Sequence, residues 1–192
     1  MIIAFHGLQG SGKSTMSEYV EKYLSYRNIP YSRYNIKDTF DEHVQSFAND
    51  LGIDKEKDLL RYKKLQKSIS CLVEEYKPTV WSDKYYKAVK AIHSSVVIIT
   101  DDIRTPMNLE ALIALSNTKP VLVFRLLASE EIRRARCSAY REGNHYTEQL
   151  LERPDEVPEQ FYWKDINTEQ SLEHAFSQID TEISAILSKI SL

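Results

Sequence analysis

Glycine is scarce in this chain, which has only five glycines among 192 residues. Three of them, Gly7, Gly10 and Gly12, fall in one short stretch near the start. Glycine adopts backbone conformations that side chains exclude, and it lets the backbone approach another group closely. A chain that uses glycine so sparingly marks this stretch as a place where the backbone itself has a special task.

Cysteine is rarer still, with Cys71 and Cys137 far apart and without the spacing of a metal site or a CxxC motif. This argues against a disulfide scaffold and predicts reduced thiols in a cytoplasmic protein. No apolar run is as long as a membrane span, and the first predicted strand leaves no room for a signal peptide. We therefore expect a soluble intracellular protein that does not engage membranes.

Neither sign of charge dominates, because 25 lysines and arginines stand against 28 aspartates and glutamates. This near balance does not indicate a nucleic-acid-binding protein, although a local basic patch can act where net charge does not. Such a patch runs through Arg61, Lys63, Lys64 and Lys67. We interpret it first as the solvated face of a helix.

The glycine-rich stretch reads G-x-x-x-x-G-K-S, between an apolar run at residues 2–6 and a helical pattern. This is a Walker A motif between a strand and a helix, a context that an ordinary glycine-rich turn rarely reproduces in full. Backbone N–H groups of such a loop surround phosphates, its lysine reaches the outer phosphates, and the next hydroxyl binds magnesium. The motif predicts that ATP and Mg²⁺ contact Gly7, Gln9, Gly10, Ser11, Gly12, Lys13, Ser14 and Thr15.

A second strand is predicted over residues 31–36, with Lys37 and Asp38 at its carboxyl end. Ligands of open parallel sheets bind at the carboxyl ends of the strands, so we expect an acceptor substrate here. Asp38 fits equally well as an acid at the start of the next helix and as a catalytic carboxylate. The mostly helical residues 36–93 form an insertion that is expected to cover the acceptor.

Aromatic residues of the insertion, Trp81, Tyr85 and Tyr86, are candidates to stack on an acceptor base. Packing in the core is the more ordinary role for such side chains. Trp81 is retained as a predicted substrate-binding residue.

Residues 95–102 form a β-branched run that ends in Asp101 and Asp102. Such a run indicates a strand buried on both faces, in the centre of a parallel sheet. A carboxylate at its end is the Walker B arrangement, which holds magnesium directly or through water. The sequence leaves open which carboxylate serves the metal, and we favour Asp102.

The helix that follows a strand at residues 121–127 is rich in arginine, with Arg133 and Arg136 on one face. Phosphoryl transfer needs cations at the developing charge, and an arginine-bearing lid commonly supplies them. We predict a lid over residues 129–158 with Arg133 and Arg136 as catalytic residues. A solvated basic helix explains any single arginine equally well.

Strands alternate with helices along the whole chain, which ends in a short strand at residues 161–166 and an amphipathic helix at 172–190. No linker or low-complexity segment interrupts residues 1–192. We predict one α/β domain, with a five-stranded, mostly parallel sheet between helices, as in the three-layer sandwich of P-loop kinases.

Several stretches, taken in order over nearly the whole chain, resemble the deoxynucleoside monophosphate kinases of large tailed phages and, more distantly, phosphomevalonate kinase. Besides the Walker A motif they are Asn35-Ile36-Lys37, similar to A-x-x-L-K; Arg61 with Leu65-Gln66, similar to R-x-x-L-Q; Asp102-Ile103-Arg104 with Pro106, similar to D-V-R-F-P; His145-Tyr146-Thr147-Glu148, similar to H-x-S/T-E; and Asp165-Ile166-Asn167, similar to D-x-x-I-x-N.

The resemblance implies transfer of the ATP γ-phosphoryl group, with Mg²⁺, to a small nucleotide under the helical insertion, in the host cytoplasm if a phage encodes the protein. It also implies that Lys13, Asp102 and Arg104 lie at the reaction centre. Asn167 would lie near the adenine, and the acceptor would contact Lys37, Arg61, Gln66 and Arg104. A homodimer is compatible with the sequence.

Two departures from the resemblance concern the acceptor. Where the family has G-T-E and then an arginine after its L-Q pair, residues 67–75 have neither glycine nor arginine, and the acid expected after Pro106 is Asn108. Loss of a cation that binds a phosphate substantially weakens the binding of that phosphate. The leading prediction is a (deoxy)nucleoside monophosphate kinase.

The alternative is a kinase of the same fold that phosphorylates a hydroxyl group, such as a hydroxymethylated base in phage DNA. A hydroxyl acceptor must lose its proton, so this reading needs Asp38 or Asp102 as a base. A nucleotide switch of the GTPase kind fits less well, because an N-K-x-D run is absent.

Overall fold

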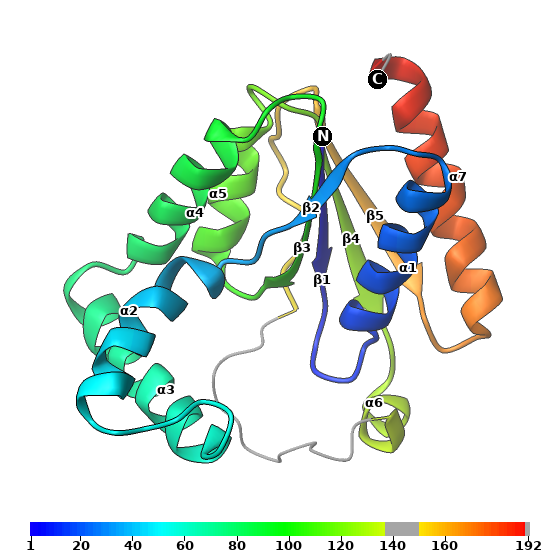
Figure 1. Ribbon diagram of the computed structural model, residues 1–192. Coiled ribbons are helices and arrows are strands. Elements are labelled where there is room, and N and C mark those ends of the chain that lie inside the picture. Colours follow the sequence, from blue (N-terminus) through cyan, green and yellow to red (C-terminus); the bar gives the residue numbers. More distant parts are fainter. Residues whose placement is uncertain (137–149, 191–192) are drawn as a thin grey trace.

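The computed structural model describes residues 1–136 and 150–190, which form a three-layer sandwich of helices, sheet and helices (Figure 1). The sheet contains β1 (Ile2–His6), β2 (Tyr31–Arg33), β3 (Val97–Ile103), β4 (Val121–Leu127) and β5 (Phe161–Asn167). The strand order is β2-β3-β1-β4-β5, and every neighbouring pair is parallel. The predicted fold class is confirmed. The predictions at Cys137 and at residues 145–148, and the part of the predicted lid at residues 137–149, lie outside the described residues.

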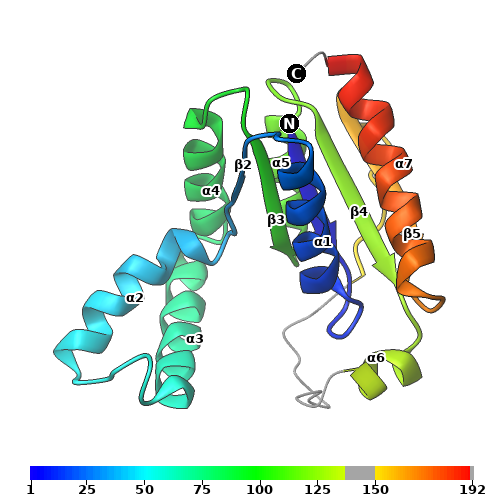
Figure 2. The ribbon, with the colours of Figure 1, turned by 45° about the vertical axis from the view of Figure 1, so that its right-hand side comes forward.

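Two helices cover each face of the sheet (Figures 1 and 2). They are α1 (Lys13–Tyr26) and α7 (Leu172–Ile190) on one face, and α4 (Val80–Ala91) and α5 (Pro106–Leu115) on the other. In β1, Ile3 and Phe5 pack toward α1 and α7, whereas Ile2 and Ala4 pack toward α4 and α5. Burial on both faces explains why the central strands read as continuous apolar runs.

Helices α2 (Asp38–Asp50) and α3 (Leu59–Tyr76) extend away from the sheet on the side of α4 (Figure 2). They have a small core of their own, made by Val44, Ala48, Ile53 and Tyr62. Helix α6 (Glu130–Arg136) lies near the carboxyl ends of the strands. The glycine-rich loop, the start of α2 and α6 therefore all lie toward the carboxyl ends of the strands.

Three strand boundaries differ from those predicted. Strand β2 ends at Arg33 rather than residue 36, because the N–H groups of Ile36 and Lys37 donate to the Asp102 carboxylate instead of a neighbouring strand. Strand β3 begins at Val97 rather than residue 95 and runs through both aspartates. Strand β5 extends to Asn167, which pairs with Leu127.

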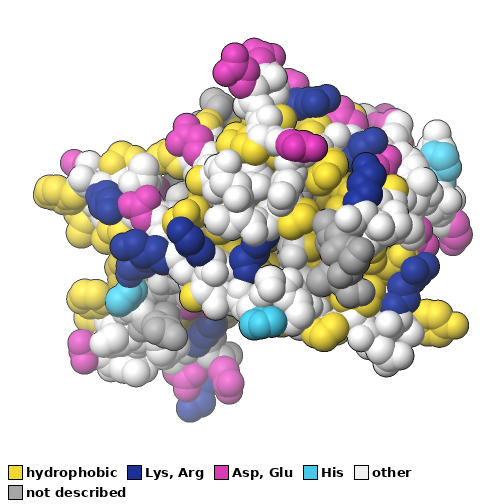
Figure 3. All heavy atoms as spheres, turned by 90° about the horizontal axis from the view of Figure 1, so that it is seen from above, with side chains coloured by type: hydrophobic (Ala, Val, Ile, Leu, Met, Phe, Trp, Pro, Cys, Tyr) yellow, Lys and Arg dark blue, Asp and Glu magenta, His cyan; other side chains and the backbone are white. Residues whose placement is uncertain are grey.

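The opposite end of the molecule, where the strands begin, carries both basic and acidic side chains (Figure 3). This mixture agrees with the near balance of charge in the sequence. None of the helices described here is both long and apolar enough to cross a membrane.

Candidate active site

The loop between β1 and α1 is shaped to hold an anion with its backbone. Gly12 is the N-cap of α1 with a φ of +98°, and the first turn has neither a side-chain cap nor an acidic residue. Its N–H groups, at the positive end of the helix dipole, are thus left for an anionic ligand. Inside the loop, buried Ser11 Oγ has no hydrogen-bond partner among the described residues. These features fit the phosphates of a nucleotide.

Gly10 allows α6 to pack directly on this loop. Its φ is +80°, and a Cβ atom there would stand 2.5 Å from the carbonyl oxygen of Arg133. Lys13 Nζ lies over the same loop, where it donates to the carbonyl oxygens of Gly7 (2.5 Å) and Leu8 (3.1 Å). Its positive charge is therefore held where phosphates would bind.

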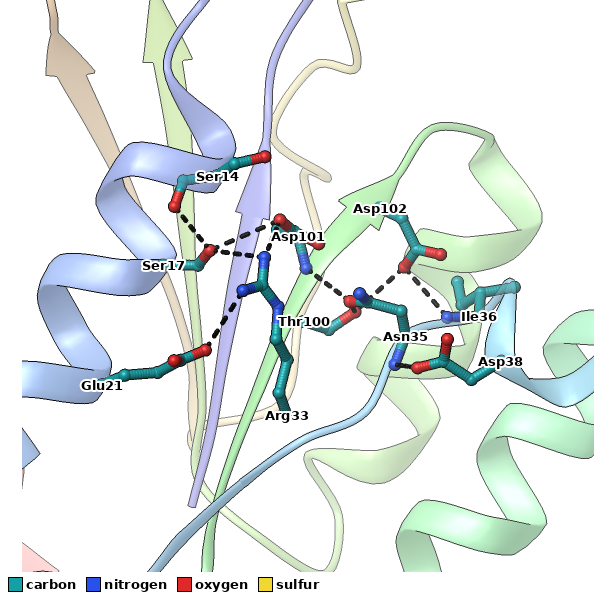
Figure 4. Close-up of polar contacts among 10 residues, drawn as sticks. All are labelled: Ser14, Ser17, Glu21, Arg33, Asn35, Ile36, Asp38, Thr100, Asp101 and Asp102. Atoms are coloured by element: carbon teal, nitrogen blue, oxygen red, sulfur yellow. Dashed lines mark hydrogen bonds and ion pairs between the residues drawn. The ribbon is translucent and has the colours of Figure 1, made fainter. Parts of the chain in front are cut away.

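The carboxylates of Asp101 and Asp102 point to different sides of the sheet (Figure 4). Asp101 Oδ2 accepts from Arg33 and lies 3.4 Å from Ser17 Oγ, which in turn donates to the carbonyl oxygen of Ser14. Asp101 is thus the carboxylate on the side of the Walker A helix. The sequence favoured Asp102 for the metal, whereas the carboxylate that Ser17 connects to Ser14 is that of Asp101.

Asp102 instead fastens the start of α2 to the sheet. Its Oδ1 accepts from Ile36 N (2.9 Å) and Thr100 Oγ1 (3.1 Å), and its Oδ2 accepts from Lys37 N (2.8 Å). Burial raises the pKa of the Asp102 carboxyl above its ordinary value, and the two backbone donors act in the opposite direction. Both oxygens of this carboxylate therefore accept hydrogen bonds from the chain itself.

Asn35 and Asp38 form the turn between β2 and α2. Asn35 Oδ1 accepts from Asp101 N (2.9 Å), and Asp38 Oδ2 accepts from Asn35 N (2.7 Å). Of the two roles considered for Asp38, this contact is the one expected of an acid at the start of a helix. Asn35, which is buried, holds the backbone of Asp101 in place.

Two arginines of α6 attach to the backbone around the glycine-rich loop. Arg133 Nη1 donates to the carbonyl oxygen of Gln9 (3.2 Å), and Arg133 is only 9% exposed. Arg136 donates to the backbone and side chain of Thr168, whose Oγ1 lies 3.0 Å from the carbonyl oxygen of Ser11. The structure therefore brings both predicted arginines to the loop.

A cavity of about 220 Å³ opens beside the loop, at the carboxyl ends of β4 and β5. Asn167 stands at its edge, where Oδ1 accepts from Glu169 N (2.8 Å). The lining of the cavity combines apolar side chains with one amide and two charged side chains. The lining residues are Leu8, Leu126, Leu127, Ala128, Arg133, Leu150, Asn167 and Glu169.

Three basic residues predicted to meet the acceptor, Lys37, Arg61 and Arg104, are exposed. Arg104 directly follows β3, which is the neighbour of β1, and the backbone N–H of Lys37 donates to Asp102 near the end of β3. Arg61 lies in the first turn of α3, whose N-cap Asp58 accepts from the Arg61 backbone N–H. No recorded contact joins these three cations to one another within residues 1–136 and 150–190.

Two other predicted acceptor residues have partners within the chain. Gln66 Nε2 donates to Asp41 Oδ1 (2.7 Å) and so ties α3 to α2. Trp81 is 6% exposed in the core under α4, and its ring packs against Phe40 with centroids 4.8 Å apart. A base cannot reach a face that other side chains already cover. Asn108 likewise caps α5, in a capping box with Thr105.

No cluster of three or more metal-ligating side chains is found in the parts of the chain that the structure describes. Mg²⁺ is commonly bound by one or two protein oxygens together with substrate phosphates. Ser14, exposed at the start of α1, and Asp101 are the oxygen donors that fit such a shared site.

Sequence reasoning missed Arg33, Asn35, Ser17 and Glu21, which surround Asp101 (Figure 4). The sequence held one signal for two of them. Ser17 and Glu21 follow the Walker A serine one helical turn apart, so they lie on the same face of the predicted helix. Nothing in the sequence pairs Arg33 with Asp101, since 67 residues separate them.

The sequence matches no family model and no curated protein. Its structure is similar to a solved gluconokinase from Sinorhizobium meliloti 1021, with a TM-score of 0.52 over 98% of this chain and 96% of the other. The chain has the fold of a P-loop kinase. At 12% sequence identity the likeness concerns the fold, and it does not single out the phage deoxynucleoside monophosphate kinases.

Proposed function

We propose that the protein is an ATP-dependent phosphotransferase that acts on a (deoxy)nucleoside monophosphate. One observation carries the proposal. Charged and polar groups converge around one helix N-terminus. They are the lysine and serine of a complete Walker A loop, the carboxylate of Asp101 and the guanidinium groups of Arg133 and Arg136. A merely structural loop has no need for this set of charges.

Each residue has a defined task in this proposal. Backbone N–H groups at the start of α1 bind the phosphates of ATP, and Lys13 neutralises the outer ones. Ser14 and Asp101 would hold Mg²⁺, whose charge would offset the negative charge on the transferred group. Arg133 and Arg136 supply further positive charge at the loop, and the cavity bordered by Asn167 receives the nucleoside part of ATP.

A nucleotide monophosphate suits the acceptor side because its attacking oxygen is already ionised and needs no general base. In this proposal the exposed cations Lys37, Arg61 and Arg104 bind its phosphate. For a hydroxyl acceptor, the base considered was Asp38 or Asp102. Both accept hydrogen bonds from backbone N–H groups, and Asp102 is buried and directed away from Ser14. Neither is arranged as a free base.

The acceptor is identified by following the label of γ-labelled ATP into two pools. One pool is a panel of nucleoside and deoxynucleoside monophosphates, and the other is DNA with plain or hydroxymethylated bases. We expect label in a nucleoside diphosphate. Label found only in DNA would reject the monophosphate acceptor in favour of a hydroxyl kinase.

A further inference from the structure

Arg33, at the end of β2, links three elements around Asp101 (Figure 4). Its Nη2 donates to Ser17 Oγ (2.9 Å) and to Asp101 Oδ2, and its Nη1 donates to Glu21 Oε1 (3.2 Å). Ser17 and Glu21 are one turn apart on α1, so the guanidinium group spans from α1 to β3. The planar fork of arginine can serve several acceptors at once, which a lysine ammonium does less well.

The hydroxyl group of Ser17 has one hydrogen and two acceptors within reach. The carbonyl oxygen of Ser14 lies 3.0 Å away and Asp101 Oδ2 lies 3.4 Å away. Because the shorter contact goes to Ser14, Arg33 is the principal donor to Asp101. Arg33 therefore acts on Asp101 directly and on the backbone of Ser14 through Ser17.

A contribution to folding stability does not explain well why Arg33 and Asp101 are paired here. Asp101 is 8% exposed, and Val97 and Ile99, which share its face of β3, are fully buried core residues. An apolar residue at position 101 would continue that core. Arg33 keeps 33% of its side chain exposed, and an ion pair that is open to solvent on one side contributes little to stability. In metal sites, by contrast, groups that orient a ligating carboxylate typically contribute 10- to 100-fold to metal affinity.

The geometry points to Arg33 as a positioning residue that holds the Asp101 carboxylate beside Ser14 and thereby strengthens binding of the metal–nucleotide complex. The inference rests on the proposed function, because it takes Asp101 and Ser14 as the protein side of a Mg²⁺–ATP site. Arg33 itself touches neither metal nor nucleotide in this role.

The test compares how tightly the protein binds a non-hydrolysable ATP analogue with and without Mn²⁺, measured by titration calorimetry. The ratio of the two dissociation constants reports the metal contribution. In R33M this ratio should fall by roughly 10- to 100-fold, while metal-free binding stays within about threefold. R33K keeps the positive charge but lacks the planar guanidinium group, and its ratio of dissociation constants should fall by roughly fivefold.

R27M is the matched control, because Arg27 ends α1, stacks 4.5 Å from the ring of Tyr23 and carries the same charge. Its metal contribution should equal that of the wild type. An unchanged ratio in folded R33M, or equal weakening with and without Mn²⁺, would overturn the role of Arg33. If R33M does not fold, R33K decides, and a full metal contribution there overturns it. A wild-type protein that binds no nucleotide would instead reject the proposed function.

Discussion

Asp101 and Asp102 are neighbours on β3, yet their carboxylates have different partners. Asp101 interacts with two side chains near the Walker A helix, whereas Asp102 accepts from two backbone N–H groups at the start of α2. At the scale of single residues, the proposed function would give Asp101 a role in metal binding and Asp102 a role in folding.

Substitution of the two aspartates should show the separation. Asp101→Asn should weaken binding of Mg²⁺–ATP by about 10- to 100-fold, because a metal ligand loses its charge. Asp102→Asn should lower the free energy of unfolding by about 1–3 kcal/mol, because a buried amide loses its acceptor, with metal dependence retained. Calorimetric titration and urea denaturation measure the two effects. The reverse assignment of effects would contradict the proposed roles.

Gly10 offers a second test at this scale. An alanine there combines a left-handed φ with a Cβ atom 2.5 Å from the carbonyl oxygen of Arg133. Gly10→Ala should therefore displace α6 and the loop together, and reduce ATP affinity by more than tenfold. Gly52→Ala is the control, since Gly52 also has a positive φ, +63°, but, apart from its chain neighbours, no atom of the described residues lies within 4 Å of its Cβ position. It should cost stability alone, about 1–3 kcal/mol. Normal ATP binding by Gly10→Ala would show that the close packing is dispensable.

Strands β4 and β5 are joined near the site by side chains as well as by their backbones. Arg125 donates to both carboxylate oxygens of Asp165, at 2.9 and 2.5 Å, and to Glu152 Oε2 at 2.6 Å. Glu152 belongs to the segment that leads back into β5. At the scale of elements, this cluster fixes the edge of the sheet that carries Asn167.

The Arg125 contact lowers the pKa of Asp165 below its ordinary value of 3.8. A carboxyl group whose pKa is lower in the folded state stabilises the fold above its unfolded pKa and loses that effect as the pH falls through the folded pKa. Asp165→Asn should therefore be less stable than the wild type near pH 7, and the difference should shrink below about pH 4. Denaturant unfolding at several pH values measures this, and a difference independent of pH would refute the linkage.

At the scale of the molecule, short-range patterns predicted the fold well. Apolar runs, the Walker A stretch and the periodicity of residues 172–190 are local signals, and they gave the sheet and its flanking helices. Contacts between distant segments escaped prediction. The direction of Asp102, the burial of Trp81 and the pairing of Arg33 with Asp101 depend on packing between elements far apart in the chain.

Alternation along β3 places Asp101 with Val97 and Ile99 on the face toward α1 and α7, and Asp102 with Ile98 on the opposite face. The choice of Asp102 rested instead on its place in the D-x-R stretch. Position in a D-x-R stretch was therefore a weaker guide than the partners that the fold supplies.

The most direct test of the central claim is the rate of ADP formation from ATP and Mg²⁺, with and without a mixture of nucleoside monophosphates, for the wild type and Lys13→Ala. We predict formation that depends on the monophosphates in the wild type and is abolished in Lys13→Ala, with Lys22→Ala, an exposed α1 variant, as active as the wild type. Full activity in Lys13→Ala, or no stimulation by any monophosphate, would contradict the account.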